Sequence, residues 1–428
     1  MKEVVIVSGV RTPVGAFGGS LKALSVVELG SIVMKNVLKR AGLKPVADEK
    51  AKAYGPGSLK DQSMIDLEKK GYDYDNGLTP IHIDEVIMGN VLQAGQGQNT
   101  ARQAMIAAGI PRHTTAFTVN KICGSGLKAI ALAAQAIKAG DADVVLAGGQ
   151  ESMSNAPMAL LKARWGHRME LTGVGDIHDL MVYDGLYEIF YGYHMGLTAE
   201  NIVEKYGITR KEQDELALLS HNRAFAAVND GTFAQEIVPV IIASKKKEIV
   251  VDKDERPMET SLDQLGKLKP AFKKDGSVTA GNASGINDGA AAVLLMSEEK
   301  ADSLGLEKLA RVKTFASGGL DPAYMGLGPV PAVRMALERA KMTIGDIDLI
   351  ELNEAFAAQA IGCIRELGID VQKPNELGSG ISLGHPIGCT GARQMVTAIH
   401  QMKRKGYSTG LISMCIGGGM GMAMVIEK

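Results

Sequence analysis

Residues 123–149 read CGSGLKAIALAAQAIKAGDADVVLAGG, and residues 389–415 read CTGARQMVTAIHQMKRKGYSTGLISMC. The two stretches align without a gap at a shift of 266 residues, and Cys123 then meets Cys389. Each stretch continues from its cysteine as a helix-like run and ends in an apolar, strand-like run. At nearly the same shift, IDEVIMGN in the first half meets IDLIELNE in the second. The sequence therefore predicts a duplicated α/β unit whose strands and helices pack in layers.

Two insertions interrupt this repeat. The first, residues 44–79, is polar and rich in Gly, Lys and Asp, and we expect it to form a surface excursion without chemistry. The second lies between the halves, where it is well placed to cover a pocket. These boundaries predict an N-terminal half at 1–152 and 280–300, an inserted loop domain at 153–279 and a C-terminal half at 301–428.

The composition describes a globular protein. Of the 428 residues, 46% are hydrophobic and 22% are charged, which excludes a disordered chain, and the net charge of −1 gives no nucleic-acid signature. No apolar run reaches the roughly 18 residues of a membrane span, and the N-terminus lacks a signal-peptide pattern. The four cysteines lack CxxC spacing, so neither a disulfide framework nor a metal cluster is expected. A cytoplasmic, reducing location suits this composition best.

Cys123 is the first candidate for chemistry. It stands between a strand-like run and Gly-Ser-Gly, and an Ala-rich helix is predicted to begin at or just after these residues. Unpaired backbone N–H groups at a helix start are expected to lower the pKa of the thiol and favour the nucleophilic thiolate. The glycines would let a substrate carbonyl approach those N–H groups. The alternative is a buried cysteine that only packs.

Three further candidates lie in the second half. His385, in SLGHPIGCTGAR, suits a general base, although a lone loop histidine is more often a surface residue. Cys415, in SMCIGGGMG, could be a second acid or base, or a core cysteine beside a turn. Asn353, in ELNEAFAAQA, could orient water or donate to an oxyanion, or could cap a helix. All stand at strand ends or helix starts, where α/β proteins build sites, and this set suits acyl transfer better than hydride transfer or metal catalysis.

Two more motifs are candidates for ligand contact. TAGNASGINDGAAAVLLMS is a run of small residues in which Ser284 could donate to a long ligand, and it is not a nucleotide-binding P-loop. GYHMGLTAEN places His194 and Met195 together in the inserted segment, where the alternative for both is ordinary packing.

These motifs together resemble those of the thiolase family. VNKICGSGLKA, NEAFA, GHPIGCTGAR and CIGGGMGMA follow the order of the family's motifs, and the resemblance covers nearly the whole chain except 44–79. GYHMGLTAEN resembles the short-chain biosynthetic type, because longer-chain degradative thiolases generally lack this histidine. The resemblance implies the α/β thiolase fold, which has duplicated βαβαβαββ halves in a five-layer αβαβα core and an inserted loop domain that binds CoA.

The resemblance implies a role for each candidate. Cys123 attacks the acyl-CoA thioester and becomes acylated, and His385 activates its thiol. His385 and a water held by Asn353 bind the thioester oxygen of the second acetyl-CoA. Cys415 removes a proton from that acetyl group, and the backbone N–H groups of Cys123 and Gly417 form the other oxyanion hole. The implied reaction is the reversible, ping-pong condensation of two acetyl-CoA to acetoacetyl-CoA and CoA.

The resemblance also implies the substrate contacts. The residues implied to contact the pantetheine are Phe272, Ala283, Ser284 and Phe356, with His194 and Met195 at the acyl end. Arg256 lies where an arginine of the family often meets the CoA nucleotide, although DKDERPMETSLDQL matches the family poorly. CoA thioesters would be substrates, without a tightly bound cofactor or a metal, and the assembly would be a homotetramer.

The sequence departs from the family at one place and leaves rival functions open. Before His385 it reads NELGSGIS where many relatives have Gly-Gly-Ala-Ile-Ala, so Ser379 and Ser382 make this loop more polar. The nearest rival is a broader or longer-chain 3-ketoacyl-CoA thiolase of fatty-acid degradation. A ketoacyl-carrier-protein synthase would generally have two second-half histidines, and a non-catalytic acyl-CoA or lipid carrier would have lost a reactive residue. Two thiols at one substrate also predict a reversible disulfide between Cys123 and Cys415.

Overall fold

The computed structural model describes residues 2–59, 62–169, 171, 175–243 and 248–428. The predicted excursion and the predicted insertion therefore each contain a few residues that lie outside the described part. No helix within the described part is both long enough and apolar enough to cross a membrane.

The N-terminal half begins with a strand whose eight residues, VVIVSGVR, are all buried, as expected for an apolar run covered on both faces. Strands and helices then alternate, as the sequence predicts. The elements of this half are β1 (Val4–Arg11), α1 (Val26–Arg40), β5 (Glu85–Gly89), α4 (Thr100–Ala107), β6 (Thr115–Val119), α5 (Ser125–Ala139), β7 (Val144–Ser152) and β14 (Asn287–Ser297).

The C-terminal half repeats this order. Its elements are β15 (Ala310–Gly319), α11 (Pro329–Ala340), β16 (Leu349–Leu352), α12 (Ala357–Leu367), α13 (Gly380–Leu383), α14 (Thr390–Lys405), β17 (Thr409–Ile416) and β18 (Met420–Glu427). Shifting α5 by 266 residues places it within α14, and the same shift places β7 over β17, which confirms the predicted duplication. One strand is not repeated. Residues 368–389, all described, carry the short helix α13 where the first half has β6.

One large mixed sheet joins the two halves. Its strand order is β16-β17-β18-β15-β1-β14-β7-β5-β6, and β2 (Gly15–Ala16) pairs with β14. The strands β5, β6 and β7 are parallel, whereas β14 lies antiparallel between β1 and β7. The halves meet where β1 pairs with β15, through Val5 with Arg311 and Ile6 with Ala310.

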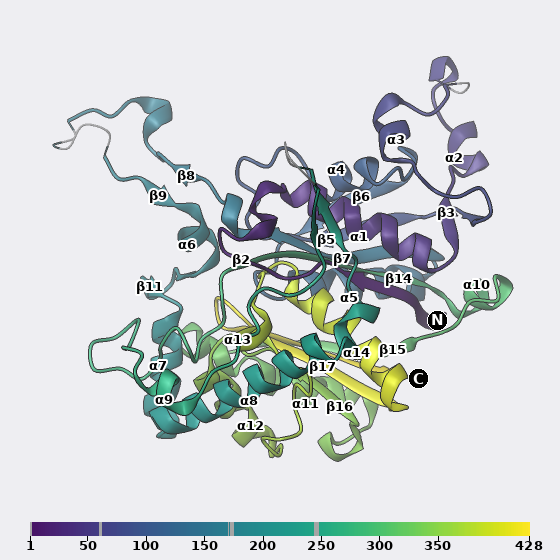
Figure 1. Ribbon diagram of the computed structural model, residues 1–428. Helices are drawn as coiled ribbons and strands as arrows, with labels where there is room; N and C mark the ends of the chain where they lie inside the picture. The colour runs from purple at the N-terminus through teal and green to yellow at the C-terminus, as the bar shows by residue number, and fades with distance from the viewer. Residues whose placement is uncertain (1, 60–61, 170, 172–174, 244–247) are drawn as a thin grey trace.

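The hydrophobic core has the predicted five layers, and Figure 1 shows them stacked from α1 and α4 at the top to α11 and α12 at the bottom. One apolar cluster packs α1 and α4 on the outer face of the N-terminal strands. A second places α5 and α14 between the strands of both halves, and a third packs α11 and α12 on the outer C-terminal face. Strand β7 shows the alternation that builds these layers, because Val145 points to the central cluster and Val144 to the outer one.

The 44–79 excursion projects beside α1 and α4, at the upper right of Figure 1. Its elements are β3 (Leu43–Pro45), α2 (Glu49–Ala53), α3 (Asp66–Gly71) and β4 (Thr79–Ile81). Two side chains fasten it to the core. The buried carboxylate of Glu68 accepts from Nη1 of Arg112 at 2.8 Å, and the hydroxyl of Tyr74 donates to the Ala108 carbonyl at 3.0 Å.

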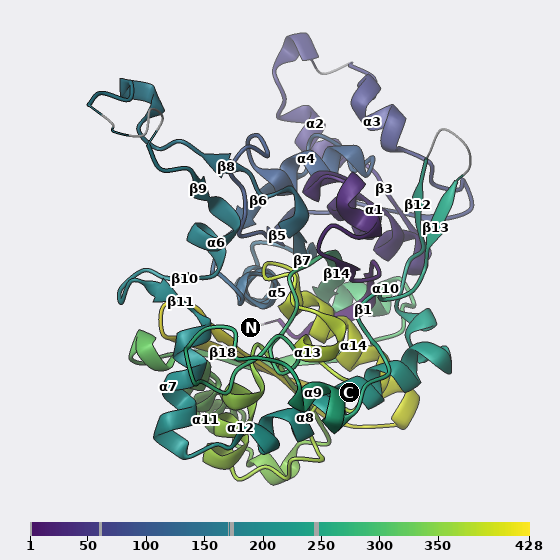
Figure 2. The same ribbon diagram turned by 60° about the vertical axis from the view of Figure 1, so that its left-hand side comes forward.

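The segment between β7 and β14 contains the second insertion. Its elements are β8 (Met158–Ala159), β9 (His178–Asp179), α6 (Leu180–Gly185), β10 (Tyr187–Glu188), β11 (Tyr193–His194), α7 (Gly196–Tyr206), α8 (Arg210–Asn229), β12 (Val240–Ile242), β13 (Ile249–Val251) and α9 (Leu262–Gly266). Helices α7 and α8 pack on α12 and α13, whereas β8 and β9 form an arm that projects from the molecule (Figure 2). Fully buried Arg11, at the end of β1, anchors this segment by bonding Asp254 at 2.6 Å and Glu236 at 2.5 Å.

Candidate active site

Cys123 lies in the tight turn between β6 and α5, so the predicted helix start is correct. The preceding residue, Ile122, has a φ of 46°, a conformation that is unusual and strained for a β-branched side chain. Local hydrogen bonds hold it there. Asn120 Oδ1 accepts from the Ile122 N–H at 3.0 Å, and the Ser125 hydroxyl donates to the Ile122 carbonyl at 2.7 Å. Cys123, which follows this strained residue, is buried.

The expected lowering of the Cys123 pKa is wrong. Burial raises the pKa of this thiol to about 11, and nearby Glu151 raises it further. The backbone N–H groups of Gly417 and of Cys123 itself bond the sulfur and lower the pKa, but by less than burial raises it. Desolvation therefore outweighs the effect of the helix start on the pKa, and the candidate nucleophile rests as a neutral thiol.

Cys415 lies at the end of β17 and is fully buried. Burial raises its pKa well above the usual value, and the nearness of Cys123 raises the pKa further. This electrostatic coupling shows that the two predicted reactive thiols lie close together, although they come from different halves. Both are free cysteines, and the reversible disulfide between them stays a prediction.

His385 lies in the loop between α13 and α14 and is buried rather than on the surface. Burial, with a contribution from the charge of Arg393, lowers the pKa of its imidazole to about 3, so the ring is neutral. Nδ1 lies 2.6 Å from the Thr390 hydroxyl. The backbone N–H of His385 donates to Oδ1 of Asn287 at 3.0 Å, which fixes the loop to the start of β14. A neutral, anchored imidazole can accept a proton.

Asn353 follows β16 and points its amide at this histidine. Its Nδ2 lies 3.4 Å from Nε2 of His385, and its Oδ1 has no partner within the described residues. The alternative of a helix cap is wrong, because α12 begins at Ala357 with Phe356 as its N-cap residue. The Asn353 amide and Nε2 of His385 thus lie side by side, and both would donate to a substrate oxygen once the imidazole has taken up a proton.

A cavity of about 570 Å³ opens beside His385. Seven of the predicted site residues line it: His194, Arg256, Phe272, Ala283, Ser284, Phe356 and His385. The backbone N–H of Ser284 donates to the Ala355 carbonyl at 2.9 Å, so the small-residue run lies along the NEAFA segment. The rings of His194 and Phe272 stack with centroids 4.8 Å apart, and Phe272 meets Phe356 edge-on at 6.0 Å.

The remaining predicted residues lie just outside the cavity lining. Met195 packs in one apolar cluster with Cys415 and Phe356, and its Cε atom would lie 2.3 Å from a Cβ added at Gly417.

Arg256 lines the cavity, but its guanidinium group is already hydrogen-bonded to the protein backbone. Its Nε donates to the Ile381 carbonyl at 2.6 Å and its Nη2 to the Ala283 carbonyl at 3.1 Å.

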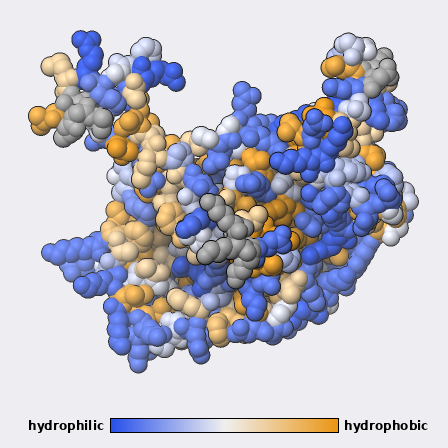
Figure 3. Space-filling view, turned by 45° about the horizontal axis from the view of Figure 1, so that its top comes forward, coloured by the Kyte–Doolittle hydropathy of each residue, from blue (hydrophilic) through white to orange (hydrophobic). Residues whose placement is uncertain are grey.

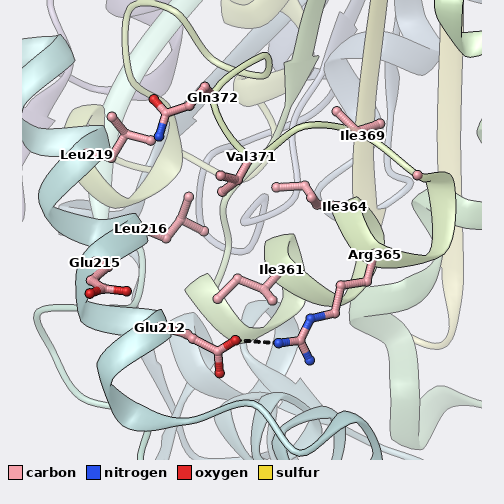
Figure 4. Close-up of a pocket in the computed structure, with 11 residues that line it drawn as sticks. Glu212, Glu215, Leu216, Leu219, Ile361, Ile364, Arg365, Ile369, Val371 and Gln372 are labelled. Carbon is pink, nitrogen blue, oxygen red and sulfur yellow. Dashed lines mark hydrogen bonds and ion pairs between the residues drawn. The ribbon is translucent and has the colours of Figure 1, made fainter.

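A second cavity, of about 530 Å³, lies between α8 and α12 (Figure 4). Leu216, Ile361 and Ile364 point into it, and an ion pair between Glu212 and Arg365 closes one side. None of the predicted site residues lines this cavity.

Several residues that hold the site together have no functional signal in the sequence. Thr390 and Asn287 stand within the quoted motifs, five residues after His385 and three after Ser284, but neither spacing indicates a bond to the histidine. Glu151 had no signal at all in the sequence beyond its place at the end of an apolar strand.

Comparisons with known proteins agree with this geometry. The chain matches the family of the thiolase N-terminal domain over residues 4–51 and 46–299, and that of the thiolase C-terminal domain over 306–428. An acetyl-CoA acetyltransferase of Syntrophomonas wolfei is 53% identical over 428 residues, which cover 100% of this chain and 99% of that protein. An acetyl-CoA acetyltransferase of Escherichia coli is 50% identical over 430 residues and is covered completely, as is this chain.

Solved structures show the same likeness. The crystal structure of the Bacillus anthracis acetyl-CoA acetyltransferase has a TM-score of 0.88 to this one, at 45% identity, covering 100% of this chain and 99% of that chain. The family matches span both halves, and the relatives are similar along the whole length. This chain therefore belongs to the thiolase family, whose members are acyltransferases.

Proposed function

We propose that the protein is an acetyl-CoA C-acetyltransferase, which interconverts two acetyl-CoA with acetoacetyl-CoA and CoA through an acyl-cysteine. One arrangement carries the proposal. Two buried thiols, Cys123 and Cys415, are electrostatically coupled, with the Gly417 N–H on the first and the Asn353–His385 pair beside the same cavity. The names of relatives at about half identity support the same substrate.

In the first half-reaction the sulfur of Cys123 bonds to the carbonyl carbon of acetyl-CoA. Its pKa of about 11 keeps it protonated at neutral pH, so its proton passes to Nε2 of neutral His385 during the attack. The N–H groups of Gly417 and Cys123 stabilise the oxyanion. The bond from carbon to the CoA sulfur then breaks, and the departing sulfur takes the proton of Cys415.

In the second half-reaction the Cys415 thiolate takes a proton from the methyl group of a second acetyl-CoA. Acylated Cys123 cannot ionise, so a negative charge on that sulfur cannot oppose the Cys415 thiolate during this step. His385 and a water at Asn353 donate to the enolate oxygen. The enolate carbon attacks the acetyl group on Cys123, whose sulfur leaves and takes back the proton from His385. Every proton is returned, and the covalent intermediate divides one difficult step into two.

The inserted segment 153–279 supplies much of the proposed CoA site. His194 accepts from the Gly196 N–H at Nδ1, at 3.0 Å, so its Nε2 carries a hydrogen that can donate to the substrate. Phe272 and Ser284 would lie along the pantetheine. Arg256 would act mainly by holding the cavity wall, since its guanidinium already bonds two carbonyls, and only its free nitrogen is left for the nucleotide.

We also propose a homotetramer in a reducing cytoplasm. The arm formed by β8 and β9 exposes large apolar side chains, including Leu161 at 55% and Trp165 at 84%. Orange patches lie along this arm, at the upper left of Figure 3. Strand β6 is at an edge of the sheet. Exposed apolar side chains and open strand edges are the features that a second copy of the chain would cover.

Substrate profiling tests the activity. The purified protein should cleave acetoacetyl-CoA in the presence of CoA faster than 3-ketooctanoyl-CoA or 3-ketohexadecanoyl-CoA, measured as kcat/KM. A clear preference for the longer substrates would instead assign it to the degradative, longer-chain thiolases.

A cysteine pair tests the nucleophile. Cys123→Ala should abolish acetyl transfer, whereas Cys389→Ala, the counterpart in the duplicated half, should retain it, because Cys389 is buried at the start of α14. Intact-mass measurement after incubation with acetyl-CoA should show one acetyl group on the wild type and on Cys389→Ala. Turnover by Cys123→Ala would overturn the assignment, and the absence of any acetylation in the wild type would favour a non-catalytic carrier.

A further inference from the structure

A fully buried carboxylate lies close to the site without a place in the mechanism. Glu151, at the end of β7, is 0% exposed. Each of its oxygens accepts two hydrogen bonds. Oε1 accepts from the Asn90 side chain at 2.7 Å and the Leu92 N–H at 3.1 Å, and Oε2 accepts from the Val91 N–H at 3.0 Å and the Gly388 N–H at 2.8 Å.

Three of these donors come from the N-terminal half and form part of the wall around the nucleophile. Val91 and Leu92 follow β5 and pack in one apolar cluster with Cys123 and Ile387. A carboxylate that fixes their backbone N–H groups therefore fixes the surface against which the thiol rests.

The fourth donor comes from the other half. Gly388 lies three residues after His385, in the loop that carries the proposed base. The fit is so close that a Cβ added at Gly388 would lie 2.5 Å from Oε2 of Glu151 and 2.9 Å from Cα of Asn90. The Gly388 carbonyl is also enclosed, since a Cβ added at Gly149 would lie 2.2 Å from its oxygen. The close contacts around Gly388 therefore leave the His385 loop only one position against the N-terminal half.

Glu151 could act on the site through its charge or through its hydrogen bonds, and these two effects are opposed. A negative charge near Cys123 raises the pKa of the thiol and disfavours the thiolate. The charge of Glu151 alone would therefore hinder the attack by Cys123. Its hydrogen bonds would favour the reaction, because they join four donors from the two halves and so hold the two halves of the site in place.

We propose that Glu151 is a positioning residue that sets the His385 loop against the Cys123 wall, and so fixes the proposed base relative to the proposed nucleophile. The inference rests on the function proposed above. Reacting groups that are displaced by about 1 Å can lose on the order of 10²-fold in rate. A carboxylate is required because either orientation of an amide would direct an NH₂ group at two N–H donors.

The test compares Glu151→Gln with Asp84→Asn. Asp84 is a matched control, because its carboxylate also accepts two backbone N–H groups, from Asp143 and Val144, at the opposite end of β7. We expect Glu151→Gln to lower kcat for acetyl transfer on the order of 10²-fold with KM changed by less than about 3-fold. Asp84→Asn should keep the wild-type kcat.

A second readout separates positioning from loss of folded protein. Burial raises the pKa of Glu151 to about 7, so its carboxyl is ionised above that pH. Alkylation of Cys123 by iodoacetamide needs only the thiolate, so above about pH 8 removal of the Glu151 charge should accelerate alkylation while acetyl transfer slows. A partly unfolded variant would also alkylate Cys123 faster, because unfolding removes the burial that raises the pKa of the thiol. It would, however, alkylate the buried Cys363 and Cys389 faster as well, whereas the positioning role predicts that these two thiols react as slowly as in the wild type. Equal kcat in Glu151→Gln and wild type, or a parallel fall in both reactions, would overturn the proposal.

If Glu151→Gln does not fold, Glu151→Asp carries the test. It keeps the charge but is one methylene shorter and cannot reach both halves, so we expect an intermediate kcat at unchanged KM, and an unchanged kcat would overturn the proposal. Wild-type protein that transfers no acetyl group would instead contradict the function proposed above, so the two failures are distinguishable.

Discussion

The Nδ1 atom of His385 lies 2.6 Å from the hydroxyl oxygen of Thr390. That hydroxyl has one hydrogen, which it donates to the Pro386 carbonyl at 3.0 Å. Thr390 therefore accepts from the imidazole, which places the ring hydrogen on Nδ1 and leaves the lone pair on Nε2. The atom that faces Asn353 is thus the one able to receive a proton.

Replacing the threonine tests this tautomer. Thr390→Val should lower kcat about 10- to 100-fold, because the imidazole loses the partner that selects its tautomer and orientation. KM should change little, and Thr390→Ser, which keeps the hydroxyl, should retain most of kcat. Steady-state kinetics of acetoacetyl-CoA cleavage measure both. A Thr390→Val enzyme with wild-type kcat would show that the ring is oriented without this bond.

The protonation of the thiol can be followed by alkylation. Burial raises the pKa of Cys123 to about 11 and lowers that of His385 to about 3, so both groups are neutral between these values. The thiolate fraction should then rise roughly tenfold per pH unit from about pH 6 to about pH 9. Mass spectrometry of the Cys123 peptide after timed reaction with iodoacetamide should follow this rise. A plateau at lower pH would instead indicate a resident thiolate–imidazolium pair.

Gly417 has no room for a side chain beside Met195. Gly417→Ala would place Cβ 2.3 Å from Cε of Met195, so the methionine or the strand end must move, and the N–H on Cys123 moves with the strand. We expect kcat to fall on the order of 10²-fold, as for loss of one oxyanion donor. The double variant Gly417→Ala with Met195→Ala should recover part of this loss. No recovery would mean that the backbone at residue 417, rather than the methionine, is the constraint.

Arg11 anchors the inserted segment through two buried carboxylates. Arg11→Met should lower the free energy of unfolding by about 3–5 kcal/mol, because Glu236 and Asp254 remain buried without their partner. Lys2→Met removes an exposed pair with Asp143 and should cost within about 0.5 kcal/mol. Chemical denaturation of both variants measures the difference. Equal stability of the two would show that water reaches the carboxylates.

The projecting arm is the proposed contact between copies. Leu161→Asp together with Trp165→Asp should shift the protein from tetramer to dimer, measured by size exclusion with light scattering, since both side chains are exposed and apolar. Leu59→Asp on the 44–79 excursion, also at an exposed leucine, should leave the assembly unchanged. An unaltered mass for the arm variant would place the interface elsewhere.

The layered fold was predictable because its signals are local and repeated. The 266-residue shift that relates Cys123 to Cys389 also relates α5 to α14 and β7 to β17. The unrepeated strand was not predictable, because the segment before His385 is held by long-range bonds rather than by its own pattern. Arg223 donates to the Pro374 carbonyl, and the Ser379 N–H donates to the Ser220 hydroxyl oxygen. The motifs also indicated Cys123, Asn353 and His385, each at a strand end or a helix start.

The electrostatics of the site could not be predicted in the same way. A helix start beside Cys123 was visible, but the burial that raises its pKa depends on residues such as Ile387 and Met153, which are far away in the sequence. The strained φ of Ile122 and the bond from His385 to Thr390 likewise depend on how the loops are seated. Local sequence thus indicates the candidate reactive groups, whereas tertiary packing decides their protonation.

The central layer has a consequence for the order in which the chain can fold during synthesis. Strand β1 is made long before its partner β14, because Val4 pairs with Ser297 and Ile6 with Leu295. The inner face of α5 packs against α14 and β17, which are made more than 250 residues later. A nascent chain must therefore keep this apolar surface exposed until β17 has left the ribosome. Contacts this distant slow folding and expose intermediates to aggregation, so production in cells should respond strongly to chaperone supply.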